Sequence, residues 1–224
     1  MAQTALYPDG IAWRAPADAR AGTRAIDFRR VVGEAGWRRL APSIRRRFAA
    51  SHAGAAATYD GTMHAVHCSR AGLLLATLGR IFGTPLAPFR QTNVPVTVTV
   101  RENGDGGVTW ERLYRPAGRP PVLISSTKIW DARLGTFEQV GGGFGMTLSV
   151  FERHGSLHFV SRRYFFAIGR LRVPLPGLLM PGTLEVVHAG AGPDRFRFTM
   201  TIRHPVLGVT FYQDGIFRDE GDLP

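Results

Sequence analysis

A few charged and phenolic side chains interrupt apolar strand patterns in this chain of 224 residues. Arg112 alternates with Trp110 and Tyr114, so an extended strand would point all three to one face. Lys128 alternates in the same way with Trp130. A buried charge is unfavourable unless it is paired or hydrogen-bonded, so charges on an inward face must meet each other, water or a ligand.

Two later segments supply a carboxylate and a phenol. Glu138 interrupts one apolar pattern, and Arg162 and Tyr164 are two residues apart in another, which predicts a shared strand face. One interpretation is a structural ion pair such as Arg112–Glu138. The other is a pocket in which Arg112 anchors a ligand carboxylate or phosphate while Glu138 or Tyr164 moves a proton. The inward faces decide between these interpretations, and the sequence leaves both open.

Lys128 is the single lysine among 28 basic residues. A lone lysine of this kind can act as a Schiff-base nucleophile. Chance retention in an arginine-biased chain is the simpler explanation.

Familiar catalytic motifs are absent: the chain has no nucleophile elbow, no P-loop, no zinc-protease helix motif and no dinucleotide fingerprint. The glycine run from Gly141 to Gly145 lies between two predicted strands, which favours a hairpin or bulge over a phosphate cradle. The histidines have no carboxylate beside them at a ligand spacing, and the single cysteine, Cys68, excludes a disulfide framework. We therefore expect no metal and no cofactor.

The formal net charge is +11, from 28 basic and 17 acidic residues. Arginines are dense between Arg14 and Arg47, above all in the run from Arg45 to Arg47. This segment is either a solvated helix face or a docking surface for an acidic protein or an anionic membrane. No recognised nucleic-acid module accompanies the charge, so we expect no nucleic-acid partner. A membrane-spanning apolar stretch and a secretory signal are also absent, which predicts a cytoplasmic protein.

The pattern of elements predicts a loosely ordered arm over residues 1–25 and one domain over residues 26–224. Asp27 caps a short helix, Pro42 opens a second, and Arg70 to Phe82 forms a third that we expect to be buried. An apolar loop or helical turn from Pro174 to Pro181 could cover one end of the domain. Residues 58–68 are expected to form a strand or a hairpin around the Asp60–Gly61 turn pair. Further strands are expected near residues 94–101, 108–114, 122–130, 136–140, 144–152, 156–166, 184–188, 195–204 and 207–217.

These elements predict a mainly β member of the α+β class. We expect an antiparallel β-barrel or strongly curved sheet of about 8–10 strands, with two or three N-terminal helices.

Several segments, in their order and spacing, resemble the bacterial DUF4166 family, a domain of unknown function, from about Phe28 to Phe217. They are Phe28–Gly33, Tyr59–Gly61, Ile81–Gly83 with Pro85, Val94–Val98, Trp110–Arg112, Phe137–Glu138, Pro174–Pro176, Met180–Pro181, Phe196–Phe198, Pro205, Gly208 and Tyr212. Members of this family occur alone or fused behind saccharopine-dehydrogenase-like or short-chain-dehydrogenase-like NAD-binding domains. The resemblance therefore implies the handling of a small molecule and an NAD-binding dehydrogenase as a partner.

We expect the domain to bind an apolar small molecule, with an acidic head group held by Arg112, as a carrier or substrate-binding module. One alternative is a cofactor-independent isomerase, cyclase or lyase that uses the same pocket. A second is a peripheral interaction protein that docks through its arginine-rich helices. The catalytic candidates are Glu138, Tyr164 and Lys128. The ligand-binding candidates are Arg112, Trp110, Tyr114, Trp130, Arg162 and Tyr212.

Overall fold

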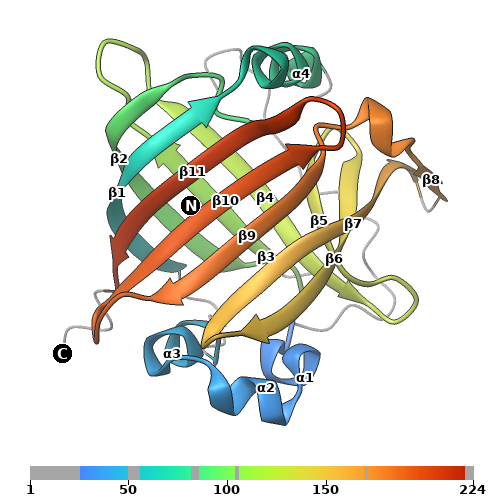
Figure 1. Cartoon of the computed structure of the whole chain (residues 1–224). Coiled ribbons are helices and arrows are strands. Elements are labelled where there is room, and N and C mark those ends of the chain that lie inside the picture. The colour runs from blue at the N-terminus through green and yellow to red at the C-terminus, as the bar shows by residue number, and fades with distance from the viewer. Residues whose placement is uncertain (1–25, 50–55, 82–85, 104–105, 170, 220–224) are drawn as a thin grey trace, which may run out of the picture.

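The protein is a closed antiparallel β-barrel of ten strands, with an eleventh strand, β8, paired to its outside (Figure 1). The computed structural model describes residues 26–49, 56–81, 86–103, 106–169 and 171–219. The sheet runs β6-β5-β4-β3-β2-β1-β11-β10-β9-β7, and a further pairing of β6 with β7 closes it. The mainly β, barrel-like fold expected from the sequence is confirmed. The predicted arm over residues 1–25 lies outside the described residues.

The strands follow the alternating patterns of the sequence. Their bounds are β1 Ala56–Cys68, β2 Gln91–Glu102, β3 Val108–Tyr114, β4 Val122–Asp131, β5 Gly135–Gly141, β6 Phe144–Arg153, β7 Ser156–Ile168, β8 Leu171–Pro174, β9 Thr183–Gly190, β10 Arg195–His204 and β11 Gly208–Arg218. In β2, Val94, Val96, Val98 and Val100 are buried while the residues between them are more exposed. Inward side chains of this kind, from all ten strands, fill the barrel as one core.

Strand β7 joins three neighbours. It pairs with β6 along most of its length, but with β9 only over Leu157–Val160, and its last residues pair with β8 instead. A bulge lies where β7 leaves β9, because Leu148 and Met146 of β6 face Ser161 and Tyr164, so two residues of β7 oppose one of β6. A bulge increases the local twist and bends the strand. The barrel wall therefore opens between β7 and β9 at one end.

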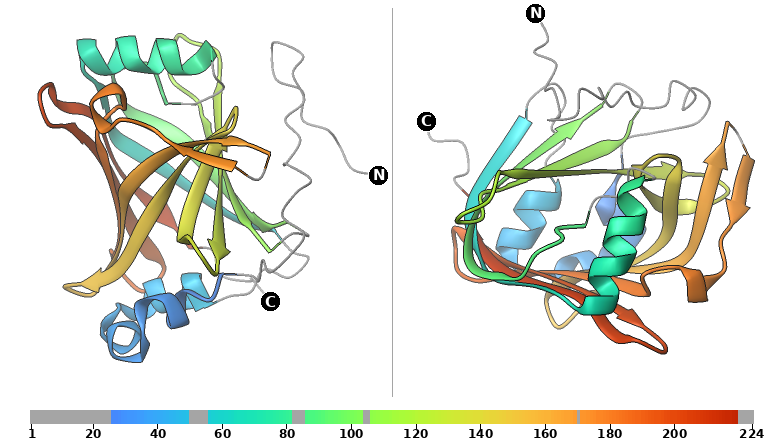
Figure 2. Two further views of the ribbon diagram at one scale, coloured as in Figure 1. Left: turned by 90° about the vertical axis from the view of Figure 1, so that its right-hand side faces the viewer. Right: turned by 90° about the horizontal axis from the view of Figure 1, so that it is seen from above.

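Helices cover the two ends of the barrel (Figure 2). At one end lie α1 (Phe28–Val32), α2 (Glu34–Arg39) and α3 (Pro42–Ala49). The Asp27 side chain caps α1 by accepting a hydrogen bond from the Arg30 backbone N–H, as expected. Phe28 and Phe48 pack against each other and against Phe159 of β7, which closes this end with aromatic rings.

Helix α4 (Arg70–Ile81) lies across the opposite end, near the one-turn helix η1 (Gly177–Leu179). The helical turn expected between Pro174 and Pro181 is therefore present. The expectation that α4 is buried is wrong in part, since Leu73 and Leu74 are exposed. The helix rests on the end of the barrel and not inside it, so only one of its faces meets the core. Among the described residues, no helix has the length and apolar character needed to cross a membrane.

Gly61 lies in the middle of β1, so the alternative of a hairpin around Asp60–Gly61 is wrong. A Cβ atom at this position would lie 2.5 Å from the Ile216 carbonyl oxygen and 2.5 Å from the Phe217 ring. The strand therefore continues through Gly61 because β11 packs directly against its backbone.

We expect Gly61→Ala to lower the free energy of unfolding by about 1–3 kcal/mol, because the neighbouring strand must shift. Urea denaturation followed by tryptophan fluorescence measures this loss. Gly177→Ala is the matched control, since an added Cβ there meets nothing within 4 Å. Equal stability of the two variants would contradict the packing argument.

Candidate functional site: a cavity inside the barrel

Three charged side chains meet on the inner wall of the barrel, from the adjacent strands β3, β4 and β5. Lys128 and Glu138 face each other directly across the β4–β5 ladder, and Lys128 Nζ lies 3.0 Å from Glu138 Oε1. Both side chains are buried. Arg112 Nη1 donates a hydrogen bond to Ser126 Oγ at 3.3 Å. The structure thus places these charges on the inner face, which the sequence left open, and the hydrogen-bonded partner of Glu138 is Lys128 and not Arg112.

The neighbouring cations keep Glu138 ionised. Burial alone would raise the pKa of this carboxyl, but the charges of Lys128 and Arg112 and a hydrogen bond from Ser126 hold its pKa below the ordinary value. Burial lowers the pKa of Lys128, and the Glu138 carboxylate opposes that change. The Lys128 ammonium also lies 4.3 Å from the centre of the Trp110 ring, a favourable cation–π contact. At neutral pH this group is an ion pair with a further cation beside it.

A cavity of about 330 Å³ extends from this charged group to the α4 end of the barrel. Its polar lining comes from Arg112, Ser125, Ser126, Glu138 and Tyr164. Its apolar lining includes Tyr114, Ile124, Val140, Phe144, Met146, Met180, Leu184, Val186, Met200, Ile202 and Phe211. The cavity thus has a charged inner end and an apolar body, and it lies beside the part of the wall where β7 leaves β9.

Arg112 faces this cavity without a carboxylate partner among the described residues. Two cations, Arg112 and Lys128, stand against the single carboxylate of Glu138, and Lys128 already holds that carboxylate. The Arg112 guanidinium has five N–H donors, of which only one makes the bond to Ser126. The inner end of the cavity therefore carries a surplus of positive charge and of hydrogen-bond donors.

Tyr164 comes from β7 and lines the same cavity. Its hydroxyl donates a hydrogen bond to the Gly182 carbonyl oxygen at 2.6 Å. Burial raises the pKa of Tyr164, and the negative charge of Glu138 adds to this effect, so the phenol stays protonated at neutral pH. Glu138 and Tyr164 thus place a carboxylate and a neutral phenol on one cavity.

The other sequence candidates divide between the inside and the outside of the barrel. Trp110 and Tyr114 point inward with Arg112, and the Tyr114 hydroxyl donates to Gln213 Oε1 at 2.9 Å. Trp130 packs against the inner core but is not part of the described cavity lining. Trp110, Arg112 and Tyr114 thus share the inward face of β3, and the expectation that they lie on one face is confirmed.

Arg162 and Tyr212 lie outside the barrel. Arg162 is exposed and donates to Ser149 Oγ at 2.7 Å, whereas Tyr164 lies inside. The prediction that these two residues of β7 share a face is wrong, because the bulge at this point reverses the alternation. Tyr212 is half-buried between the inward residues Phe211 and Gln213, so it also faces outward.

Arg47 and His188, which the sequence patterns did not single out as site residues, are buried together near the charged group. Arg47 Nη1 donates to His188 Nδ1 at 3.0 Å, and the guanidinium lies 3.6 Å from the centre of the Phe196 ring. Burial lowers the pKa of Arg47 to about 10, and burial together with Arg47 lowers the pKa of His188 well below its ordinary value. The burial of Arg47 could have been predicted from the helical pattern, because Arg47 follows Leu40 and Ile44 at the spacing of one apolar helix face.

A second cavity of about 310 Å³ lies at the end of the barrel that α1–α3 cover. Arg47, Tyr59 and Trp110 are part of its lining, together with residues of α1. Trp110 lines this cavity, whereas Arg112, two residues on, lines the other.

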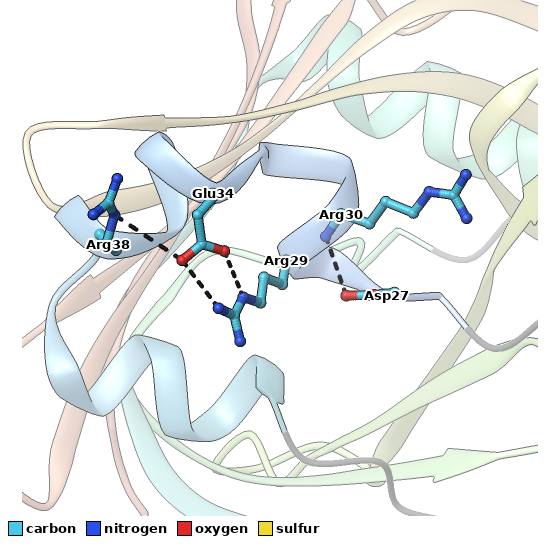
Figure 3. Close-up of polar contacts among 5 residues, drawn as sticks. All are labelled: Asp27, Arg29, Arg30, Glu34 and Arg38. Carbon is cyan, nitrogen blue, oxygen red and sulfur yellow. Dashed lines mark hydrogen bonds and ion pairs between the residues drawn. The ribbon is translucent and has the colours of Figure 1, made fainter.

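Most arginines of the helices α1–α3 already have partners. Arg29 makes two hydrogen bonds to Glu34, and Arg38 lies 4.0 Å from the same carboxylate (Figure 3). Arg39 pairs with Glu152, and Arg46 donates to the Pro193 carbonyl oxygen. With Arg47 buried, the run from Arg45 to Arg47 is not one continuous basic face. Docking of an acidic protein or an anionic membrane onto α1–α3 stays a prediction, and fewer arginines are available for it than the sequence indicated.

The Lys128–Glu138 pair should show strong energetic coupling. Lys128→Met or Glu138→Met alone should lower the free energy of unfolding by about 3–5 kcal/mol. Glu138→Met leaves the buried Lys128 and Arg112 without a carboxylate, and Lys128→Met leaves Glu138 without its ion-pair partner. The double variant should lose much less than the sum. Urea denaturation of all four proteins gives the coupling, and the same cycle on the outer pair Arg197–Asp214 is the control, since solvent screens that pair. Additive losses at Lys128 and Glu138 would contradict the assignment.

Comparison with known proteins follows the resemblance found in the sequence. The model of the family described as "Domain of unknown function (DUF4166)" matches residues 40–217, which is well over half of the chain and includes the whole barrel. No curated protein and no solved structure matches. Within the described residues, no group of three or more histidine, cysteine, aspartate or glutamate side chains is arranged to hold a metal ion. The family match confirms the resemblance, and the chain belongs to the DUF4166 family.

Proposed function

We propose that this domain binds an amphipathic small molecule with an apolar body and an acidic head group, and that it acts as a carrier or substrate-binding module. The observation that carries the proposal is Arg112, a guanidinium that faces an apolar cavity with no carboxylate partner among the described residues. A ligand carboxylate or phosphate would neutralise this charge and accept its remaining N–H groups.

The remainder of the cavity supports an apolar body for the ligand. Met146, Met200 and Ile202 are among side chains that offer only apolar contacts, and burial of ligand surface against them is favourable. A volume of about 330 Å³ lies at the lower end of the range of roughly 300–1,000 Å³ found for small-molecule sites. Methionine side chains adapt to different shapes, so the site favours a class of ligands over one rigid molecule.

A specific observation also favours a second candidate, a cofactor-independent isomerase, cyclase or lyase. The ionised Glu138 can accept a proton, and the protonated Tyr164 can donate one, on the same cavity. Lys128 would then hold Glu138 in place and not act as a nucleophile, because its ammonium is engaged in the ion pair. Proton transfer through these groups needs no bound metal or nucleotide.

Arg112→Gln should weaken the binding of decanoate about 10- to 100-fold, because it removes charge-assisted hydrogen bonds worth about 1.5–3 kcal/mol. Decanol, which has the same apolar body without the charge, should bind both proteins alike. Isothermal titration calorimetry measures both ligands. The matched control is Arg162→Gln, which removes an arginine from the outer wall and should leave decanoate affinity unchanged.

Two results would overturn the binding proposal. One is equal decanoate affinity of the wild type and Arg112→Gln. The other is a protein that binds neither decanoate nor decanol and carries no small molecule in native mass spectrometry after purification.

The enzyme candidate has a separate test in deuterated water. If Glu138 abstracts a carbon-bound proton, the ligand recovered from the purified protein should gain deuterium during incubation with wild type. Glu138→Gln should bind the ligand and abolish the exchange, and Tyr164→Phe should slow it. These amounts are read by mass spectrometry. Absence of exchange with the wild type would leave the domain as a binding module alone.

A further inference from the structure

The end of the barrel that carries α4 exposes large apolar side chains from three separate elements. They are Leu73 and Leu74 of α4, Leu178 of η1, and Val206 and Leu207 of the β10–β11 turn, and we call them the distal face. Leu178 is 68% exposed and Val206 is 75% exposed. All three elements lie at the end opposite α1–α3 (Figures 1 and 2). The α4 leucines that were expected to be buried belong to this face.

Side-chain hydrogen bonds fix the distal face in place. His204 Nδ1 accepts the backbone N–H groups of Val206 and Leu207, at 3.1 Å and 3.2 Å. Its Nε2 must then carry the proton, which it donates to the Leu178 carbonyl oxygen at 3.1 Å. One buried imidazole thus ties η1 to the β10–β11 turn. The hydrogen bonds of His204 therefore hold Leu178, Val206 and Leu207 in fixed positions on the surface.

Charge is distributed unequally between the two ends. The described connections at the distal end are residues 69–81, 86–90, 115–121, 141–143, 169, 171–182 and 205–207, and they contain arginines but no aspartate or glutamate. Arg70, Arg119 and Arg203 are exposed there and form no ion pair among the described residues. The end covered by α1–α3 instead carries the carboxylates of Asp27, Glu34, Glu102, Asp131, Glu152, Asp194 and Asp219. The described connections of the distal end therefore combine exposed apolar tips with arginines and contain no carboxylate.

We propose that the distal face docks onto the surface of an anionic lipid bilayer. Apolar tips flanked by arginines suit the boundary between headgroups and acyl chains, where the tips are buried and the guanidinium groups meet lipid phosphates. A bilayer can accept the five apolar side chains without a fixed binding geometry, although they come from a helix and two turns. An acidic protein would match the charge but not these apolar side chains.

The cavity reaches the same end of the barrel. Leu75 of α4 and Met180 and Pro181 after η1 are part of its lining. Docking on a bilayer would thus bring the apolar cavity next to lipid, so that an amphipathic acid could enter or leave with little exposure to water. This last step rests on the proposed function, whereas the docking itself does not.

Sedimentation with vesicles tests the apolar part of the face. Wild type should bind vesicles of phosphatidylglycerol and phosphatidylcholine, and bind pure phosphatidylcholine weakly. Leu178→Asp combined with Val206→Asp should reduce binding to the anionic vesicles at least about tenfold, because two apolar side chains that enter the bilayer in the docked state become charged. The matched control is Leu134→Asp, an exposed leucine at the other end of the barrel that should have no effect.

A second set of variants tests the charged part. Changing Arg70, Arg119 and Arg203 to Gln should weaken vesicle binding, by up to about fivefold for each arginine near the surface. The control changes Arg30, Arg38 and Arg45 on the helices at the other end. A loss confined to this control would overturn the proposal in favour of docking through α1–α3. Binding to soluble polyglutamate but not to vesicles would overturn it in favour of an acidic macromolecule.

Decanoate titration keeps the two proposals apart. The Leu178→Asp/Val206→Asp protein should lose vesicle binding and keep decanoate affinity, which also shows that it is folded. Arg112→Gln should lose decanoate affinity and keep vesicle binding. Retained vesicle binding in the first variant would overturn the docking proposal, whatever the cavity binds.

Discussion

Closure of the sheet through β7 is the constraint on which the rest of this molecule depends. Every barrel strand has two neighbours, so no long edge is left unpaired, and inward side chains form one enclosed core. Yet β7 serves three neighbours and leaves β9 after Val160. Beyond that point side chains complete the wall: the Ser161 hydroxyl accepts the Leu184 N–H and the Tyr164 hydroxyl donates to Gly182. The cavity lies next to this incomplete part of the wall because neighbouring backbone there is not held together by a ladder.

An enclosed core makes every inward charge consequential. Lys128 and Glu138 satisfy each other across one ladder step, while Arg47 is satisfied by aromatic rings and a neutral histidine. Among the inward charged residues that the structure describes, Arg112 faces the cavity with N–H donors that no described group accepts. The inner wall thus separates charges that stabilise the barrel from a charge that is free for a ligand, and this distinction underlies the proposed function.

The excess of arginine has different roles at the two ends. Around α1–α3, arginines pair with carboxylates such as Glu34 and Glu152, or turn inward as Arg47 does. At the distal end the arginines lie beside exposed leucines with no carboxylate nearby in the connecting segments. Net charge alone would favour the arginine-dense helices as the docking surface. Position relative to acidic and apolar neighbours points to the opposite end instead.

The sequence by itself determined the mainly β fold, most strand positions, and the shared strand face of Trp110, Arg112 and Tyr114, because alternation of side chains is a local property of extended backbone. It also identified the family. Which face points into the barrel was decided by the tertiary structure. Only the tertiary structure decided that Glu138 pairs with Lys128, that Arg47 is buried and that Leu73 and Leu74 are exposed, since pairing and burial depend on residues far away in the chain. The clearest case is Arg162 and Tyr164. Their spacing predicts one face, but the bulge between them depends on the register of β6, and a change of register by one residue moves a side chain from solvent to core.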